Sequence, residues 1–172
     1  MSRITTLSLD QATDTTRPLL EGVQKKIGFL PNVFKTLAHA PAVLSAYLQQ
    51  SAALGKTSLS ASEKEAIFLA TSQVNGCDYC LAAHTLFAGK AGLSAQDILS
   101  ARQGQLNAVA TLARQITESR GHLNNEQIEA ARAGGITDAK IIEVVAHIAS
   151  QTLTNYLNNL ALTDIDFPAI DA

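Results

Sequence analysis

The sequence is poor in aromatic residues and in cysteine. Of its 172 residues none is tryptophan, 5% are aromatic and only two are cysteine. Two cysteines are too few for the disulfide framework that stabilises many small secreted proteins. The hydrophobic share is 47%, and alanine, leucine, isoleucine and valine dominate it, which favours closely packed helices.

Charge and long apolar runs are also scarce. The charged share is 16%, the net charge is −2 and no basic run occurs, so composition gives nucleic-acid binding no support. No uninterrupted apolar stretch approaches the roughly 18 residues that span a bilayer, and residues 1–10 lack the apolar segment of a signal peptide. We therefore expect one globular domain over residues 1–172 in the cytoplasm, with no nucleic-acid or membrane partner and with reduced thiols.

Apolar residues recur at helical spacing along almost the whole chain, and no segment alternates with a period of two, so we predict an all-α fold. Ser60 and Glu63 have the spacing of a capping box at a helix start. An acidic tail, 163–172, is expected to dock loosely. The predicted helices cover residues 14–27 (with Asp14 as a cap), 33–38, 42–54, 61–75, 77–91, 95–101, 106–119, 126–133 and 138–160.

The sequence contains a weak internal repeat. Glu65 and Ser72 match Glu143 and Ser150 at the same offset, and Asn155 and Asn158 then stand where the first copy has its two cysteines. Either a helical unit was duplicated and one copy kept the chemistry, or the matches are chance in an alanine-rich helical protein. Under the first alternative Glu143, Asn155 and Asn158 are packing residues of a silent copy.

Four residues form the most informative motif: Glu65, Cys77, Cys80 and His84, in the spacing E-x11-C-x-x-C-x-x-x-H. Residues three and four apart share a helix face, and two cysteines three residues apart are close enough to form a disulfide. Cys77 follows Gly76 at a helix start, where free N–H groups stabilise a thiolate. This argument favours Cys77 as the thiol of lower pKa.

The same spacing brings Glu65 and His84 together. Glu65 precedes Gly76 by eleven residues and His84 follows it by eight. If the two helices form a hairpin at Gly76, the side chains lie about 16 and 12 Å from the turn at a rise of about 1.5 Å per residue. They would be nearly level, so a carboxylate, an imidazole and two thiols could share one pocket and relay protons.

Two other interpretations of the cysteine pair remain open at this point. Cys77, Cys80 and His84 could supply three ligands to zinc, with Glu65 as a fourth. The two cysteines could also be small buried residues of the core.

The full motif resembles the active-site signature of the alkylhydroperoxidase D (AhpD)-like members of the carboxymuconolactone decarboxylase superfamily. The segment Gly28-Phe29-Leu30-Pro31-Asn32, followed by Pro41, is similar to the G-x-x-P-N…P pattern of that family's peroxidase-related branch. The resemblance covers about residues 28–92 and more loosely the C-terminal helices. It implies an all-helical, single-domain oxidoreductase that forms homo-oligomers.

The resemblance also implies roles for the residues of the motif. Cys80 would be oxidised by a hydroperoxide substrate, Cys77 would resolve the sulfenic acid as a disulfide, and Glu65 with His84 would relay protons. An external dithiol, such as a lipoyl-bearing or thioredoxin-like protein, would reduce the disulfide; no cofactor or metal is implied. Tyr79 stands where some members carry a second histidine, and we expect an accessory residue with its hydroxyl near the pocket.

Because the helix-start argument favours Cys77 and the resemblance favours Cys80, the order of attack stays open at this level. The predicted function is a thiol-dependent alkylhydroperoxide reductase. The alternative belongs to another functional class: a non-enzymatic redox sensor or regulatory protein of the same fold. Lactone decarboxylation, which gives the superfamily its name, does not use a C-x-x-C pair.

Overall fold

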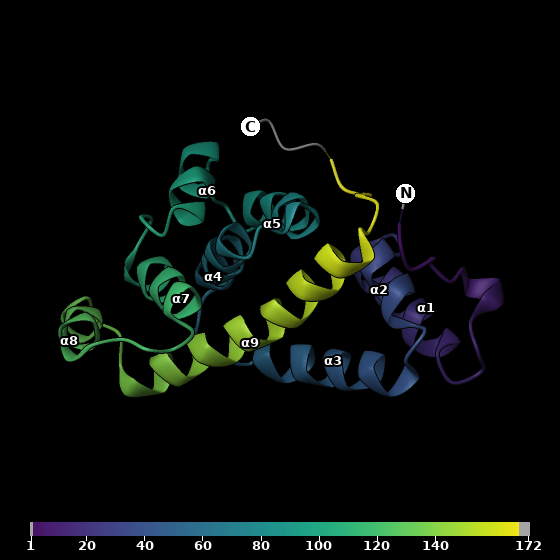
Figure 1. Cartoon of the computed structure of the whole chain (residues 1–172), viewed down its shortest axis with the longest axis horizontal. Helices are drawn as coiled ribbons and strands as arrows, with labels where there is room; N and C mark the ends of the chain where they lie inside the picture. The colour runs from purple at the N-terminus through teal and green to yellow at the C-terminus, as the bar shows by residue number, and fades with distance from the viewer. Residues whose placement is uncertain (1, 169–172) are drawn as a thin grey trace.

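The computed structural model describes residues 2–168. Within these residues the chain is all-helical, as predicted, and contains no strand (Figure 1). A short 3-10 helix, Leu9–Gln11, precedes α1 (Arg17–Ile27), α2 (Asn32–Leu37), α3 (Pro41–Leu54), α4 (Ala61–Val74), α5 (Asp78–Lys90), α6 (Ala95–Arg102), α7 (Ala108–Ser119), α8 (Asn125–Ala133) and α9 (Asp138–Ala161). None of these helices is long and apolar enough to cross a membrane.

The long helix α9 crosses the whole molecule (Figure 1). The helices α4 to α7 lie on one side of it, and α1 to α3 lie on the other. α4 contacts α5, α6, α7 and α9, while α2 and α3 reach α9 from the opposite side. One residue of α9 can therefore touch both halves of the molecule.

The α4–α5 hairpin is built as the sequence indicates. Glu63 N donates to Ser60 Oγ at 3.2 Å and Ser60 N donates to Glu63 Oε2 at 2.8 Å, which completes the predicted capping box. Gly76 separates the helices with φ +61°, a left-handed conformation that costs other residues about 1–2 kcal/mol. This turn lets α5 fold back along α4.

The N-terminal part and the tail differ from prediction. The first helix begins at Arg17 rather than at residue 14. Asp14 is not its cap, because the hydroxyls of Thr13, Thr15 and Thr16 bond to one another just before the helix instead.

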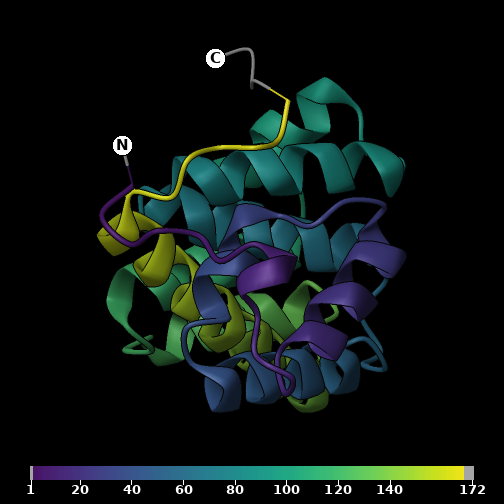
Figure 2. The ribbon, with the colours of Figure 1, turned by 90° about the vertical axis from the view of Figure 1, so that its right-hand side faces the viewer.

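The tail is the larger correction. Residues 163–167 were expected to dock loosely, yet Phe167 is buried and Asp166 is hydrogen-bonded to two distant residues. The expectation failed because it treated an acidic segment as solvated and gave no weight to its one aromatic residue. Figure 2 shows this segment running from the end of α9 alongside α5, near the start of the chain. Residues 169–172 of the predicted tail lie outside the described residues.

Candidate active site

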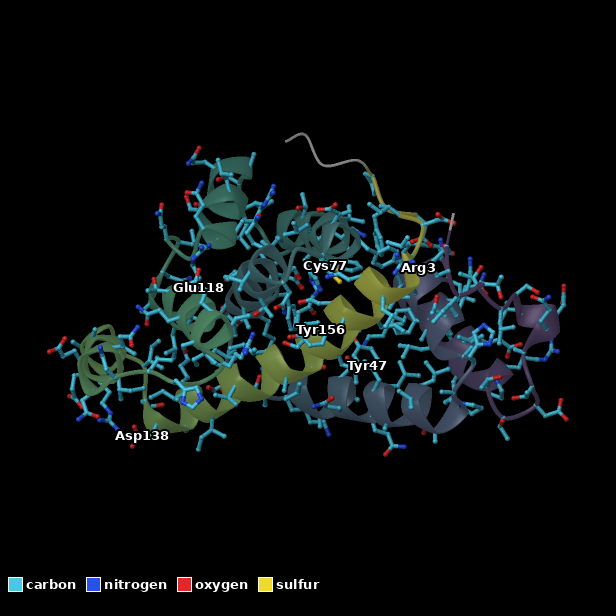
Figure 3. All side chains as sticks on the ribbon, in the orientation of Figure 1. Arg3, Tyr47, Cys77, Glu118, Asp138 and Tyr156 are labelled. Atoms are coloured by element: carbon cyan, nitrogen blue, oxygen red, sulfur yellow. The ribbon has the colours of Figure 1, made fainter. Side chains whose placement is uncertain are left out.

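The two cysteines lie at the start of α5, inside a hydrophobic core (Figure 3). Cys77 is the N-cap of α5, and its Sγ accepts a hydrogen bond from Cys80 N at 3.3 Å. Cys77 is fully buried and Cys80 is 3% exposed. Both are free thiols. Burial alone would make both thiols poor thiolates.

The neighbours of Cys80 reverse that effect. The Cys77 thiol donates a hydrogen bond to the Cys80 sulfur, and Asn158, the charge of His84 and Asn155 add to it, so the pKa of Cys80 falls to about 7 despite burial. The same hydrogen bond, together with burial and the negative charge on Cys80, raises the pKa of Cys77. Cys80 is thus the thiolate of the pair and Cys77 holds its proton.

This arrangement corrects the helix-start argument, which favoured Cys77 as the more acidic thiol. The N-cap position does give Cys77 one backbone N–H donor. However, the charge of His84 lowers the pKa of Cys80 and is not among the influences on Cys77. The Cys77 proton instead stabilises the neighbouring Cys80 thiolate. A fixed hydrogen-bond donor at short range outweighs the helix terminus.

Glu65 on α4 and His84 on α5 meet as the predicted hairpin requires. His84 Nδ1 lies 2.8 Å from Glu65 Oε2, and the two side chains are 16% and 15% exposed. Phe68 stacks against the imidazole with ring centroids 4.7 Å apart. The hairpin geometry read from the spacing is therefore confirmed.

The other imidazole nitrogen faces a second acceptor. His84 Nε2 lies 3.1 Å from Gln151 Oε1, and Gln151 Nε2 donates to Ser72 Oγ at 2.9 Å. With an oxygen acceptor at each nitrogen, the doubly protonated imidazolium satisfies both bonds. Burial opposes the charge, but Glu65, the Cys80 charge and Gln151 outweigh it, and the pKa of His84 is raised.

The contribution of α9 lies outside the sequence motif. Asn158 Nδ2 donates to Cys80 Sγ at 3.4 Å, and Asn155 Nδ2 donates to Ser72 Oγ at 3.1 Å. Asn155 and Asn158 were expected to be packing residues, whereas both lower the pKa of Cys80. The feature of the sequence that could have pointed to them is the weak internal repeat, which aligns these two asparagines with the two cysteines. The duplication itself stays a prediction.

Glu143, the third residue of the supposed silent copy, does not join the site. Its carboxylate accepts from Ser58 N at 3.0 Å and from Ser58 Oγ at 2.7 Å. Glu143 thus ties α9 to the loop before α4.

A small cavity of about 100 Å³ opens onto Cys80. Its walls are mostly apolar and aromatic, with His84, Thr154 and Asn158 among the polar residues, and Cys77 does not line it. Larger hollows, of 490 Å³ near Lys35 and of 410 Å³ between α7 and α9, contain neither cysteine nor His84. The lining of the small cavity includes Tyr47, Tyr79, Cys80, His84, Phe87 and Phe167.

The two tyrosines at this cavity differ in role. The Tyr79 hydroxyl accepts from Val33 N at 3.1 Å and donates to Asp166 Oδ1 at 2.8 Å, so it is committed to the tail rather than to Cys80. Burial raises the pKa of Tyr79. Burial and the Cys80 charge raise the pKa of Tyr47 to about 12. Both phenols therefore stay neutral, and the sequence analysis had not singled out Tyr47.

The zinc interpretation gains no support from this geometry. Within residues 2–168, no three His, Cys, Asp or Glu side chains form a group that could hold a metal ion. Both nitrogens of His84 face hydrogen-bond partners, and the Cys80 sulfur accepts from Asn158.

Comparison with known proteins agrees with this fold and motif. A family model described as the carboxymuconolactone decarboxylase family matches residues 39–113. No curated protein matches the chain in sequence.

Several solved structures share the architecture. The AhpD core of an uncharacterized peroxidase-related protein from Ralstonia eutropha JMP134 is 28% identical, over 96% of this chain and 92% of that one, with a TM-score of 0.85. A second uncharacterized peroxidase-related protein, from Silicibacter sp. TM1040, is 24% identical over 94% and 91% of the two chains, with a TM-score of 0.79. The debrominase Bmp8, in complex with 2,3,4-tribromopyrrole, is 22% identical over 95% and 91%, with a TM-score of 0.80.

The helical fold is that of AhpD-like proteins, and it brings Glu65, Cys77, Cys80 and His84 together. The family match over residues 39–113 and the likeness to the AhpD core support an AhpD-like member of the carboxymuconolactone decarboxylase superfamily. The family match and the likeness to a peroxidase-related AhpD core suggest an enzyme.

Proposed function

We propose that the protein is a thiol-dependent hydroperoxide reductase that cycles Cys77 and Cys80 between dithiol and disulfide. The observation that carries the proposal is the asymmetry of the pair. Cys80 faces the cavity with a pKa of about 7, while Cys77 lies behind it and donates its proton to the Cys80 sulfur. An oxidant in the cavity would meet the thiolate first.

In the first step the Cys80 thiolate attacks the terminal oxygen of the hydroperoxide. The S–O bond forms, the O–O bond breaks, and the bonding electrons leave with the alkoxide. The imidazolium of His84, held by Glu65, lines the same cavity and gives the alkoxide its proton. The products are the Cys80 sulfenic acid and an alcohol. A positioned general acid contributes about 10²–10⁴-fold to such a step.

In the second step Cys77 attacks the sulfur of the sulfenic acid. The S–S bond forms, the S–O bond breaks, and the hydroxide leaves as water with the proton of Cys77. Part of what raises the pKa of Cys77 is the negative charge on Cys80. Oxidation of Cys80 to a neutral sulfenic acid removes that charge, so Cys77 becomes easier to deprotonate when its attack is needed.

In the third step an external dithiol, such as a lipoyl-bearing or thioredoxin-like protein, reduces the disulfide and is itself oxidised to a disulfide. The test supplies a hydroperoxide and a dithiol to the purified protein and follows both. The proposal predicts many turnovers per chain, none in Cys80→Ser, and an accumulating sulfenic acid in Cys77→Ser. A single oxidation without turnover would identify a redox sensor instead, and equal activity in Cys80→Ser would overturn the assignment of Cys80.

A further inference from the structure

The segment after α9, residues 163–167, brings Phe167 to the active-site cavity. It leaves the end of α9 and runs alongside α5 (Figure 2). Thr163 and Phe167 are buried, whereas Ile165 between them is 49% exposed. Residues 163–168 themselves are not helical.

Asp166 fastens this segment to two distant parts of the chain. Its Oδ1 accepts from the Tyr79 hydroxyl at 2.8 Å, and its Oδ2 accepts from Asn32 N at 2.8 Å. Asn32 Nδ2 also donates to Asp164 O at 2.9 Å. Tyr79 stands between the two cysteines, so the carboxylate connects the tail directly to the first turn of α5.

Phe167 forms one wall of the cavity that opens onto Cys80. Its ring makes edge contacts with Phe29, Tyr79 and Phe87, at centroid distances of 5.4, 5.5 and 5.9 Å. Edge-to-face contacts are a favoured arrangement of aromatic rings. The ring is therefore positioned by its aromatic neighbours and by the adjacent Asp166.

The size of the cavity limits what can reach the thiolate. Its volume is about 100 Å³. A cavity that admits benzene measures about 150 Å³. The space beside Cys80 thus accommodates hydrogen peroxide or a short alkyl hydroperoxide, and it is smaller than a cavity that admits benzene.

We infer that Phe167, fastened through Asp166, is the specificity-determining residue that restricts the oxidant to hydrogen peroxide and the smallest alkyl hydroperoxides. This inference rests on the proposed function for its substrate. Its physical content, a size limit at the Cys80 thiolate, also applies to any reagent that attacks that sulfur.

The experiment compares a small and a bulky reagent of each kind on the full-length protein. The peroxides are hydrogen peroxide and cumene hydroperoxide, and the alkylating agents are iodoacetamide and N-phenylmaleimide, with the modified cysteine located by mass spectrometry. Phe167→Ala should raise the rate with the bulky member of each pair by about tenfold or more, within the range of about 10–200-fold by which apolar pockets discriminate. The rate with the small member should change by less than about threefold.

Matched variants distinguish the loss of the Phe167 side chain from a general loosening of residues 163–167. Ile165→Ala alters the same segment at an exposed position outside the cavity, and it should leave both ratios unchanged. Phe167→Leu should give an intermediate ratio, and Asp166→Ala should raise the bulky rates because the fastening is lost. Circular dichroism confirms that each variant keeps its helices.

The two kinds of reagent keep the two proposals apart. If Cys80 is alkylated with the predicted size dependence but no peroxide is consumed, the proposed function fails and the size limit stands. If Phe167→Ala leaves the bulky-to-small ratio unchanged for both the peroxides and the alkylating agents, the inference is overturned.

Discussion

His84 Nδ1 and Glu65 Oε2 lie 2.8 Å apart, although nineteen residues and a helix break separate them in the chain. The carboxylate keeps the imidazole charged in a place where burial opposes charge. The pair therefore acts on the neighbouring sulfur in two ways. It places a positive charge near the Cys80 thiolate, and it holds a proton at the wall of the cavity.

Glu65→Gln tests the pair directly. The amide removes the negative charge that raises the pKa of His84, so less imidazolium is present at neutral pH and the acid needed for the leaving alkoxide is depleted. We expect peroxide reduction at neutral pH to slow by about 10²–10⁴-fold, the range of general acid–base catalysis. The high-pH limb of the rate profile should also move to lower pH. Stopped-flow measurement of peroxide consumption across pH records both effects.

Glu63→Gln is the matched control, two residues away on α4. Glu63 Oε1 lies 2.6 Å from Lys140 Nζ, and the carboxylate also accepts a hydrogen bond from Ser60 N. Neither contact involves a cysteine. This variant should lose a little stability and keep its rate profile. An unchanged rate in Glu65→Gln would remove Glu65 from the mechanism.

The acidity of Cys80 gives a pH dependence with a definite sign. Its pKa of about 7 means that the thiolate forms as pH rises through neutrality. The rate of alkylation by iodoacetamide should therefore increase through this range and level off above it. In Cys77→Ala the main donor to the sulfur is gone, and the midpoint should move up toward the ordinary value of about 8.5. A midpoint that stays in place would show that Cys77 does not stabilise the thiolate.

Asn158 provides a separate test from α9. Its side-chain amide donates to Cys80 Sγ at 3.4 Å and lowers the pKa of Cys80. Asn158→Ala should raise the midpoint of alkylation, by less than loss of Cys77 does because the Cys77 bond is the larger cause. Asn159→Ala is the control, because Asn159 Nδ2 donates to Asn75 O and not to the Cys80 sulfur. Equal shifts in both variants would trace the effect to α9 as a whole.

The parts of this site that sequence could predict are the local ones. Cys77, Cys80 and His84 are joined by helical spacing, and Glu65 reaches them through one hairpin whose turn is marked by Gly76. The contacts from α9 and the tail join residues about eighty positions apart, such as Asn158 with Cys80 and Tyr79 with Asp166. No periodicity connects segments at that separation.

The acidity of the thiols shows the same limit. A helix start can be read from the sequence, and it favoured Cys77. The result also depends on donors from another element, because Asn155 and Asn158 of α9 both lower the pKa of Cys80. A pKa set by tertiary neighbours cannot be read from the element that carries the thiol.

The exposed face of α9 carries the remaining prediction, homo-oligomerisation. Ile142, Tyr156 and Leu160 are 70%, 62% and 61% exposed, and Tyr156 is seen on this helix in Figure 3. Tyr156 and Leu160 are four residues apart and share a helix face. Tyr156 and Val145 also line the apolar hollow between α7 and α9. A second copy that buries this face would remove the tyrosine ring and two aliphatic side chains from water, each worth about 1.5–3 kcal/mol if fully buried.

Tyr156→Asp should therefore lower the oligomer order measured by light scattering coupled to size exclusion. A charge in the centre of a buried apolar contact is costly, whereas the same change on a free surface is nearly neutral. Glu118→Gln, on an exposed part of α7 where Glu118 pairs with Arg114, is the control and should keep the assembly. The Cys80 midpoint should not move in Tyr156→Asp, because no Cys80 contact involves this side chain among the described residues. A Tyr156→Asp protein with an unchanged mass in solution would show that α9 does not form the interface.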